Sequence, residues 1–175
     1  SKNEIKIAEL NKGASIAAGS LRRRAQLLNF RPDFSMKDIR GNIDTRLRKF
    51  KNEKYDAMVL AAAGLLRLNL AEHITEYIST DIIVPAAGQG AIAIEVKETN
   101  LEAREIIRGI NHRETEVSVI AERSFLRKLQ GGCHVPIGAN ATINNENLIL
   151  TGMVSNFDGS VMIRDTISYD LNYPE

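Results

Sequence analysis

Apolar and polar residues alternate in two different ways along this chain, and the first way covers its first half. The apolar spacing predicts a helix over residues 19–30, with Ser20 as its N-cap, and a second helix over residues 43–53. A strand is predicted over residues 34–39, and the apolar run 55–64 is typical of a buried strand that leads into a helix. Strands that alternate with short helices indicate an α/β domain with a parallel sheet.

A second group of elements follows the first. The pattern predicts a strand over residues 90–97 and a helix over residues 100–110 that begins at Asn100. The longest helical stretch covers residues 113–130, and the glycine pair that follows ends it. The residues expected on the buried face of this helix are Val117, Ile120, Phe125 and Leu129.

Beyond Pro136 the apolar residues follow a period of two. Strands are predicted over residues 138–143, 148–154 and 161–169, and the turns between them are rich in Asn and Asp-Gly. This pattern predicts a three-stranded antiparallel sheet packed on a helix. The expected fold class is therefore α/β, in which an α/β domain precedes a small α+β domain.

Composition narrows the class of protein. The 175 residues are 43% hydrophobic and 26% charged, as in ordinary globular proteins, and they include one cysteine. No apolar run is long enough for a membrane span and no export signal is visible, so we expect a cytoplasmic protein with no membrane partner. The net charge of +1 argues against a general nucleic-acid binder. Because the chain opens on Ser1 and closes on "YPE" straight after a predicted strand, we expect a fragment of something longer.

Arginines cluster near two predicted helix starts. Arg22 and Arg23 lie in the first turn of one helix, and Arg40 and Arg46 surround the start of the next. Cations at a helix N-terminus oppose the helix dipole unless an anion is bound, and guanidinium forks suit carboxylates and phosphates. We therefore expect an anion site that faces a cleft between domains, at the edge where the strands end. A solvated basic face is the alternative, and few aromatic residues lie nearby to stack nucleic-acid bases.

A glycine-rich turn leads into the predicted strand at residue 90. In "PAAGQG", Gly88 and Gly90 flank Gln89, so the backbone can approach a ligand closely and the glutamine offers a side-chain amide. Such turns are common between strands, so this motif alone is weak.

The only cysteine, Cys133, lies in the loop "GGCHVPIGA" after the long helix. It cannot form an internal disulfide, and neither a catalytic pair with the adjacent His134 nor a zinc site has suitable spacing. A single cysteine is ordinarily a small buried apolar residue. The preceding glycines leave the sulfur little side-chain cover, which fits an exposed thiol that carries a group covalently.

Together these motifs resemble the porphobilinogen deaminase (hydroxymethylbilane synthase) family. The matching stretches are "SLRRRAQL", "IRGNIDTRL", "YDAMVLAAAGLLRL", "PAAGQGAIAIE", "AERSFLRKLQGGCHVPIGA" and the "DGS" hairpin, between Gly13 and about Ser168. The resemblance implies a transferase that joins four porphobilinogen molecules head to tail, with release of ammonia, in tetrapyrrole (porphyrin and haem) biosynthesis. It also implies α/β domains like those of periplasmic binding proteins, and a monomeric parent enzyme.

A cofactor and a set of site residues are implied by the same resemblance. Cys133 matches the cysteine that holds a dipyrromethane cofactor through a thioether bond. The residues that match cofactor- and substrate-binding positions are Ser20, Arg22, Arg23, Arg40, Asn42, Arg46, Arg67, Gln89 and Gly90. The arginines would neutralise the acetate and propionate groups that every pyrrole brings. No metal and no nucleic acid are implied.

The sequence departs from the family pattern in ways that bear on activity. The family's catalytic aspartate lies in an N-terminal stretch that this sequence lacks, so no catalytic residue is assigned. We expect the chain alone to be inactive and its Cys133 to carry no cofactor. Ala17, Ala18 and Gly19 replace the usual Gly-Thr-Ser, which removes a hydroxyl contact.

The resemblance divides the chain into three segments. Residues 1–90 match the middle α/β domain, residues 91–110 a remnant of the first domain, and residues 111–175 a truncated third domain that anchors the cofactor. Two other classes of function stay open, a non-catalytic anion- or carboxylate-binding α/β module and an RNA-binding domain. The cysteine loop favours the enzyme, because a plain binding module has no need of it.

Overall fold

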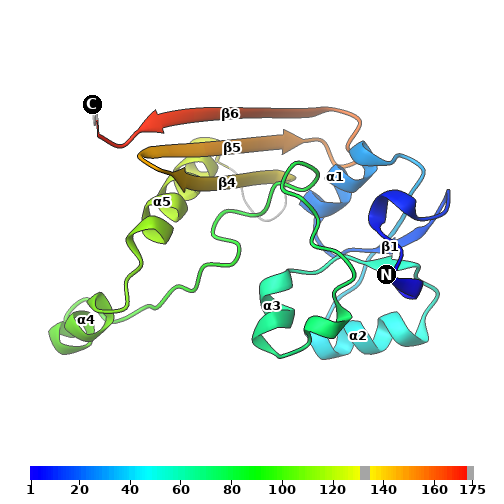
Figure 1. Ribbon diagram of the computed structural model, residues 1–175, viewed down its shortest axis with the longest axis horizontal. Helices are drawn as coiled ribbons and strands as arrows, with labels where there is room; N and C mark the ends of the chain where they lie inside the picture. Colours follow the sequence, from blue (N-terminus) through cyan, green and yellow to red (C-terminus); the bar gives the residue numbers. More distant parts are fainter. Residues whose placement is uncertain (131–134, 173–175) are drawn as a thin grey trace.

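A short central strand organises the first part of the molecule. The computed structural model of the chain describes residues 1–130 and 135–172. In it β1 (Ser15–Ala17) pairs in parallel with both β2 (Ser35–Lys37) and β3 (Ala57–Met58), so the strand order is β2-β1-β3. α1 (Leu21–Phe30) connects β1 to β2, and α2 (Ile43–Asn52) connects β2 to β3 (Figure 1). The predicted alternation of strands and helices is confirmed.

Three short elements and one further helix complete this part. α3 (Ala62–Arg67) follows β3, as the apolar run with small residues predicts. The 3₁₀ turns are η1 (Lys2–Glu4), η2 (Ile7–Glu9) and η3 (Ala71–His73).

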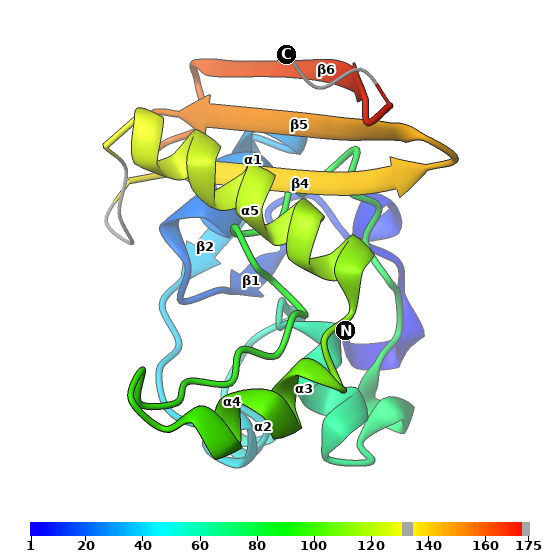
Figure 2. The ribbon, with the colours of Figure 1, turned by 90° about the vertical axis from the view of Figure 1, so that its left-hand side faces the viewer.

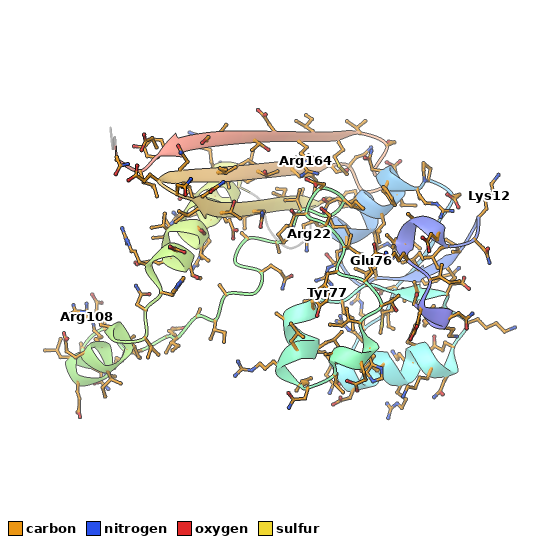
Figure 3. The ribbon with its side chains drawn as sticks, in the orientation of Figure 1. Lys12, Arg22, Glu76, Tyr77, Arg108 and Arg164 are labelled. Atoms are coloured by element: carbon orange, nitrogen blue, oxygen red, sulfur yellow. The ribbon has the colours of Figure 1, made fainter. Side chains whose placement is uncertain are left out.

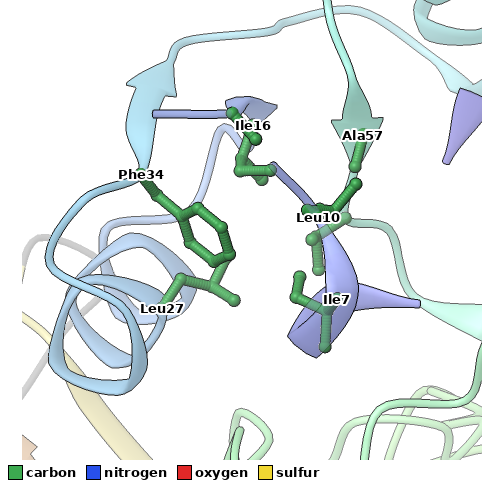
Figure 4. Packing of buried hydrophobic residues seen from close by; sticks show 8 residues of the cluster. Ile7, Leu10, Ile16, Leu27, Phe34 and Ala57 are labelled. Carbon is green, nitrogen blue, oxygen red and sulfur yellow. The ribbon is translucent and has the colours of Figure 1, made fainter. Parts of the chain in front are cut away.

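The core of the α/β part lies between the sheet, α1 and the first turns of the chain. Figure 4 shows the ring of Phe34 between Ile16 of β1 and Leu27 of α1, and Ile16 and Leu27 are completely buried. Each buried aliphatic side chain of this size contributes about 1.5–3 kcal/mol to stability. The cluster also includes Ile7, Leu10 and Ala57. This packing fixes α1 against the sheet and therefore fixes the direction of its N-terminal arginines.

The second part is an antiparallel sheet covered by a long helix. β4 (Ile137–Asn144), β5 (Asn147–Ser155) and β6 (Met162–Asp170) pair in that order. α5 (Arg113–Lys128) lies across β4 and β5 (Figure 2), and α4 (Leu101–Arg108) precedes it. The predicted fold class, a parallel α/β unit followed by a three-stranded antiparallel sheet, is confirmed.

A connecting segment, residues 79–90, joins the two parts, and we call it the strap. The side-chain amide of Gln26 on α1 binds both backbone groups of Val84, with Val84 N donating at 2.7 Å and Val84 O accepting at 3.1 Å. On the other side, Ala139 N of β4 donates to Pro85 O at 2.9 Å. A Cβ at Gly138 would lie 2.9 Å from Val84 O, so β4 approaches the strap closely because this residue has no side chain.

The turn between β5 and β6 makes a second contact with α1. Asn29 Nδ2 donates to Gly159 O at 2.9 Å. Gly159 has a φ of +73°, and a Cβ there would lie 2.1 Å from Ala25 O. The "DGS" motif is thus the point where the antiparallel sheet rests on the helix that carries Arg22 and Arg23.

The strand predicted over residues 90–97 is wrong. This segment has no regular secondary structure, and Ile92 and Ile94 are 74% and 53% exposed. A strand needs a neighbour to pair its backbone N–H and C=O groups. Figure 1 shows the segment running alone towards α4, and none of the strands in the described parts of the chain pairs with it.

The predicted buried face of α5 is also wrong in part. Ile120 and Leu129 are 52% and 43% exposed, whereas Glu122 is only 7% exposed. The helix turns towards the sheet on the side of Glu122 and Phe125, because Gly152 of β5 leaves room there for the phenyl ring. Sequence spacing alone identified the helix but not the side on which the sheet would lie.

The contact between Phe125 and Gly152 provides a stability test. A Cβ at Gly152 would lie 2.5 Å from Phe125 Cζ, so Gly152→Ala should lower the free energy of unfolding by about 1–3 kcal/mol through overpacking. Gly109→Ala is the matched control, since its Cβ would lie 3.5 Å from the nearest atom and its φ is −66°. Thermal or urea unfolding measures both changes. Equal midpoints for the two variants would contradict this packing.

Candidate functional site

The arginines of α1 lie at the edge of the parallel sheet where its strands end. β1 ends at Ala17 and α1 begins at Leu21, so Arg22 and Arg23 occupy the first turn of the helix. Beside them is a cavity of about 840 Å³. Its wall includes Val59 and Leu60, which follow β3, so the cavity opens at the carboxyl ends of the strands, where ligands bind in α/β sheets.

Arg22 is the most buried cation of the site. The residue is 7% exposed, and its guanidinium donates to Val84 O of the strap. The pKa of Arg22 is lowered to about 10. Burial is the larger cause, and the positive charge of nearby Arg23 is the smaller one. Retaining a charge there is costly, and a bound anion would relieve that cost.

Arg23 is half-buried and reaches the glycine-rich turn. Its guanidinium donates to Gln89 Oε1 at 3.3 Å and to Val59 O at 3.5 Å. Burial lowers the pKa of Arg23, and the charge of Arg46 lowers it as well. Arg46 Nε is buried and has no hydrogen-bond partner in the parts of the chain that the structure describes. Arg23 therefore has two other guanidinium groups nearby, those of Arg22 and Arg46. None of the three forms an ion pair with a carboxylate among the described residues.

The glycine-rich turn forms the part of the wall next to Arg23. Gly88 and Gly90 have φ values of +74° and +90°, which only glycine adopts without strain. The turn places Gln89 and Gly90 in the wall of the cavity. Figure 3 labels three other residues that line it, Arg22, Glu76 and Tyr77.

The cavity differs from the expected cleft between domains. Every described residue that lines it lies between Ser1 and Gly90. The antiparallel sheet contacts the strap and α1 instead, so it supports the cavity from outside. Of the predicted site residues that the structure describes, Arg22, Arg23, Gln89 and Gly90 alone line the cavity.

The other predicted site residues that the structure describes do not line this cavity. Arg40 is exposed and pairs with Asp38 at 2.9 Å, and Asn42 Oδ1 caps α2 by accepting from Thr45 N at 2.9 Å. Ser20 is the N-cap of α1 but makes no side-chain cap hydrogen bond, and Arg67 ends α3 with an exposed side chain. Their roles stay predictions. Cys133 lies outside the described residues.

The sequence before Ser20 is constrained by packing. Ala17 and Ala18 are completely buried, and a Cβ at Gly19 would lie 2.5 Å from Ile39 O. A serine at position 19 would therefore require the backbone around Ile39 to shift. The absence of a hydroxyl here fits the close approach of the two loops.

Sequence reasoning missed Glu122, a buried carboxylate on α5. Its Oε2 accepts from Gly88 N at 2.6 Å, and its Oε1 accepts from Ala141 N at 2.8 Å. The signal was present, because Glu122 lies three residues before Phe125 and hence on the same helix face. A charged residue on that face was not expected to be buried.

In residues 1–130 and 135–172, no three His, Cys, Asp or Glu side chains gather as metal ligands would. Within the same residues, no helix has both the length and the apolar character to cross a bilayer.

Comparison with known proteins identifies the family. Residues 1–105 match the family model described as porphobilinogen deaminase, dipyromethane cofactor binding domain. Residues 117–175 match the model described as porphobilinogen deaminase, C-terminal domain. The chain belongs to the porphobilinogen deaminase family. The resemblance inferred from the motifs is thereby confirmed.

Relatives within the porphobilinogen deaminase family are similar along nearly the whole chain. The porphobilinogen deaminase of Geobacillus sp. (strain WCH70) is 50% identical over 170 residues, which are 96% of this chain and 55% of the relative. That of Chlorobium phaeovibrioides is 48% identical over 168 residues, 96% of this chain and 54% of the relative. The chain thus spans about half the length of the curated relatives that it matches.

The crowded guanidinium groups predict stabilisation by a dicarboxylate. Succinate at about ten times its dissociation constant should stabilise the chain by about 1.4 kcal/mol, or about 3–5 °C in Tm, relative to sodium chloride at equal ionic strength. Arg23→Gln should lose most of this gain, because one of the desolvated cations is removed. Differential scanning fluorimetry measures both.

Arg24→Gln is the matched control, since it removes the same charge from the same helix turn and Arg24 does not line the cavity. An equal loss of the succinate effect in Arg24→Gln and Arg23→Gln would mean that the effect is general screening.

Proposed function

We propose that this chain carries the carboxylate-binding part of the active site of a porphobilinogen deaminase. The whole enzyme would be a transferase, hydroxymethylbilane synthase, which condenses four porphobilinogen molecules head to tail and releases ammonia. One observation carries this proposal in the structure. Arg22 and Arg23, both desolvated, line a cavity whose wall also includes Gln89 and Gly90.

The residues present suit a dipyrromethane cofactor. Each pyrrole ring brings an acetate and a propionate, and the lowered pKa values of Arg22 and Arg23 mark guanidinium groups that a carboxylate would stabilise. The buried Nε of half-buried Arg46, which has no partner among the described residues, offers one further donor. When bound, the cofactor supplies a covalently held primer to which the growing chain is joined. We propose Cys133 as its attachment point, through a thioether bond.

Arg22 and Arg23 would bind carboxylates in different ways. Arg22 is fixed by Val84 O and is buried, so it would orient one carboxylate in a single geometry. Arg23 makes only long hydrogen bonds, at 3.3 and 3.5 Å, and can exchange them for a carboxylate. Gln89 would then be free to bind a polar group of the ligand. The predicted roles of Ser20, Arg40, Asn42, Arg46 and Arg67 belong to the same proposal.

The domain assignment also remains a proposal. Residues 1–90 would be the middle domain, 111–175 the cofactor-anchoring domain, and 91–110 a part of the first domain. The exposed apolar side chains of this last segment support that assignment, since Ile92, Leu101, Ile106 and Ile110 are all more than half exposed. A cytoplasmic setting and a monomeric parent enzyme remain predictions of the same kind.

The 175-residue chain should be inactive with porphobilinogen. The family's aspartate, thought to steady the cationic intermediate, lies in a stretch without counterpart in this sequence, and electrostatic stabilisation is commonly the largest catalytic term. An assay for hydroxymethylbilane with purified chain should give no signal above the no-enzyme rate. Turnover that Arg22→Leu abolishes would show that this chain contains the catalytic apparatus.

The attachment point can be tested by intact mass. We expect a free thiol on the 175-residue chain and a discrete dipyrromethane adduct on the full-length parent enzyme, because loading requires surfaces that the chain alone does not supply. Cys133→Ser in the parent should remove the adduct.

An adduct on the 175-residue chain that Cys133→Ser removes would support the anchor and contradict the claim that the chain cannot load itself. A parent enzyme without any adduct at Cys133 would overturn the assignment. A plain carboxylate-binding module would bind succinate and carry no adduct in either form.

A further inference from the structure

Glu122 is the one buried carboxylate in the described residues that neither the fold nor the arginine site explains. It lies in the middle of α5 and is 7% exposed. A buried carboxylate is costly unless it is hydrogen-bonded. Its two oxygens each accept from a backbone N–H, Oε2 from Gly88 at 2.6 Å and Oε1 from Ala141 at 2.8 Å. Charge-assisted hydrogen bonds of this kind are roughly twice as strong as neutral ones.

These two hydrogen bonds join three separate segments. Ala141 belongs to β4, Glu122 to α5, and Gly88 to the glycine-rich turn of the strap. One side chain therefore connects the antiparallel sheet to the turn that forms a wall of the cavity.

The turn has few other attachments. The strap is fixed to α1 and β4 at Val84 and Pro85. Apart from the local turn hydrogen bond from Ala91 N to Gly88 O, the only hydrogen bonds from residues 86–90 to the rest of the described chain are those of Gly88 with Glu122 and of Gln89 with Arg23. Because the Arg23 bond is 3.3 Å long, the Glu122 bond is the stronger of the two.

The geometry points to Glu122 as a positioning residue for the cavity. We propose that its carboxylate holds Gly88 so that Gln89 faces Arg23, and that this contact couples the arginine cavity to α5. α5 ends at Lys128, and the loop with Cys133 follows it in the sequence. The coupling would thus connect the carboxylate site to the helix that leads to the attachment loop. The proposed coupling rests on the function proposed above for the cavity. The two hydrogen bonds of Glu122 are independent of that function.

The test compares three variants of the 175-residue chain by NMR. Glu122→Leu removes both acceptor oxygens. Glu122→Gln keeps one of them, so this variant can still be measured if the leucine variant fails to fold. Phe125→Leu is the matched control, since Phe125 lies on the same helix face but contacts Gly152 rather than the turn. Amide exchange at Gly88 and Ala141 and the side-chain signals of Gln89 and Arg23 are measured in each.

In Glu122→Leu we expect exchange at Gly88 to rise at least tenfold relative to Phe125→Leu, and the Gln89 and Arg23 side-chain signals to shift. Glu122→Gln should show a smaller effect at one of the two amides. Exchange and signals equal to those of the control in both Glu122 variants would overturn the proposal.

A binding measurement separates this inference from the proposed function. The affinity of succinate should fall about tenfold in Glu122→Leu and stay within twofold in Phe125→Leu. An unchanged affinity together with a loosened Gly88 would overturn the coupling, although the hydrogen bond would stand. A wild-type chain that binds no succinate would contradict the proposed function, and the NMR signals of Gln89 and Arg23 would still decide whether Glu122 positions the turn.

Discussion

The hydrogen bonds between α1 and the backbone of Val84 hold the candidate site together. Gln26 binds the N–H and the C=O of Val84, and Arg22 donates to the same C=O. All three groups are buried, and a buried polar group left unpaired costs about 1–3 kcal/mol. The strap therefore cannot leave α1 without a large penalty. The next residue of the strap, Pro85, accepts a hydrogen bond from β4, so fixing the strap on α1 also places the antiparallel sheet.

This constraint explains how the cavity can hold closely spaced cations. The guanidinium of Arg22 donates a hydrogen bond to Val84 O, which keeps it from turning towards solvent. The positive charges of Arg23 and Arg46 repel each other nearby. Solvated arginines would avoid one another, whereas the packing of α1 on the sheet holds Arg22 and Arg23 side by side, and Arg46 approaches from α2. A site that accumulates carboxylates benefits from such an arrangement, since each bound anion relieves repulsion that already exists.

Much of this arrangement was predictable from the sequence, for reasons that differ between elements. The α1 and α2 helices were found because their apolar spacing is local, and the family was found because its motifs are long. The strand at residues 90–97 was wrong because pairing depends on a neighbour that local pattern does not reveal. Glu122 was missed because its partners, Gly88 and Ala141, are distant in sequence and use backbone groups. Arg22, Arg23, Gln89 and Gly90 were predicted as site residues, but the cleft between domains was not found, since every described residue that lines the cavity lies between Ser1 and Gly90.

The central claim is that Arg22 and Arg23 bind the carboxylates of a pyrrole ligand against Gln89 and Gly90. A crystal structure of the chain with bound porphobilinogen tests it most directly. The account predicts the acetate or the propionate within hydrogen-bond distance of both guanidinium groups, with the ring in the cavity of about 840 Å³. A ligand bound elsewhere, for example at exposed Arg40 or Arg67 with the cavity empty, would contradict it.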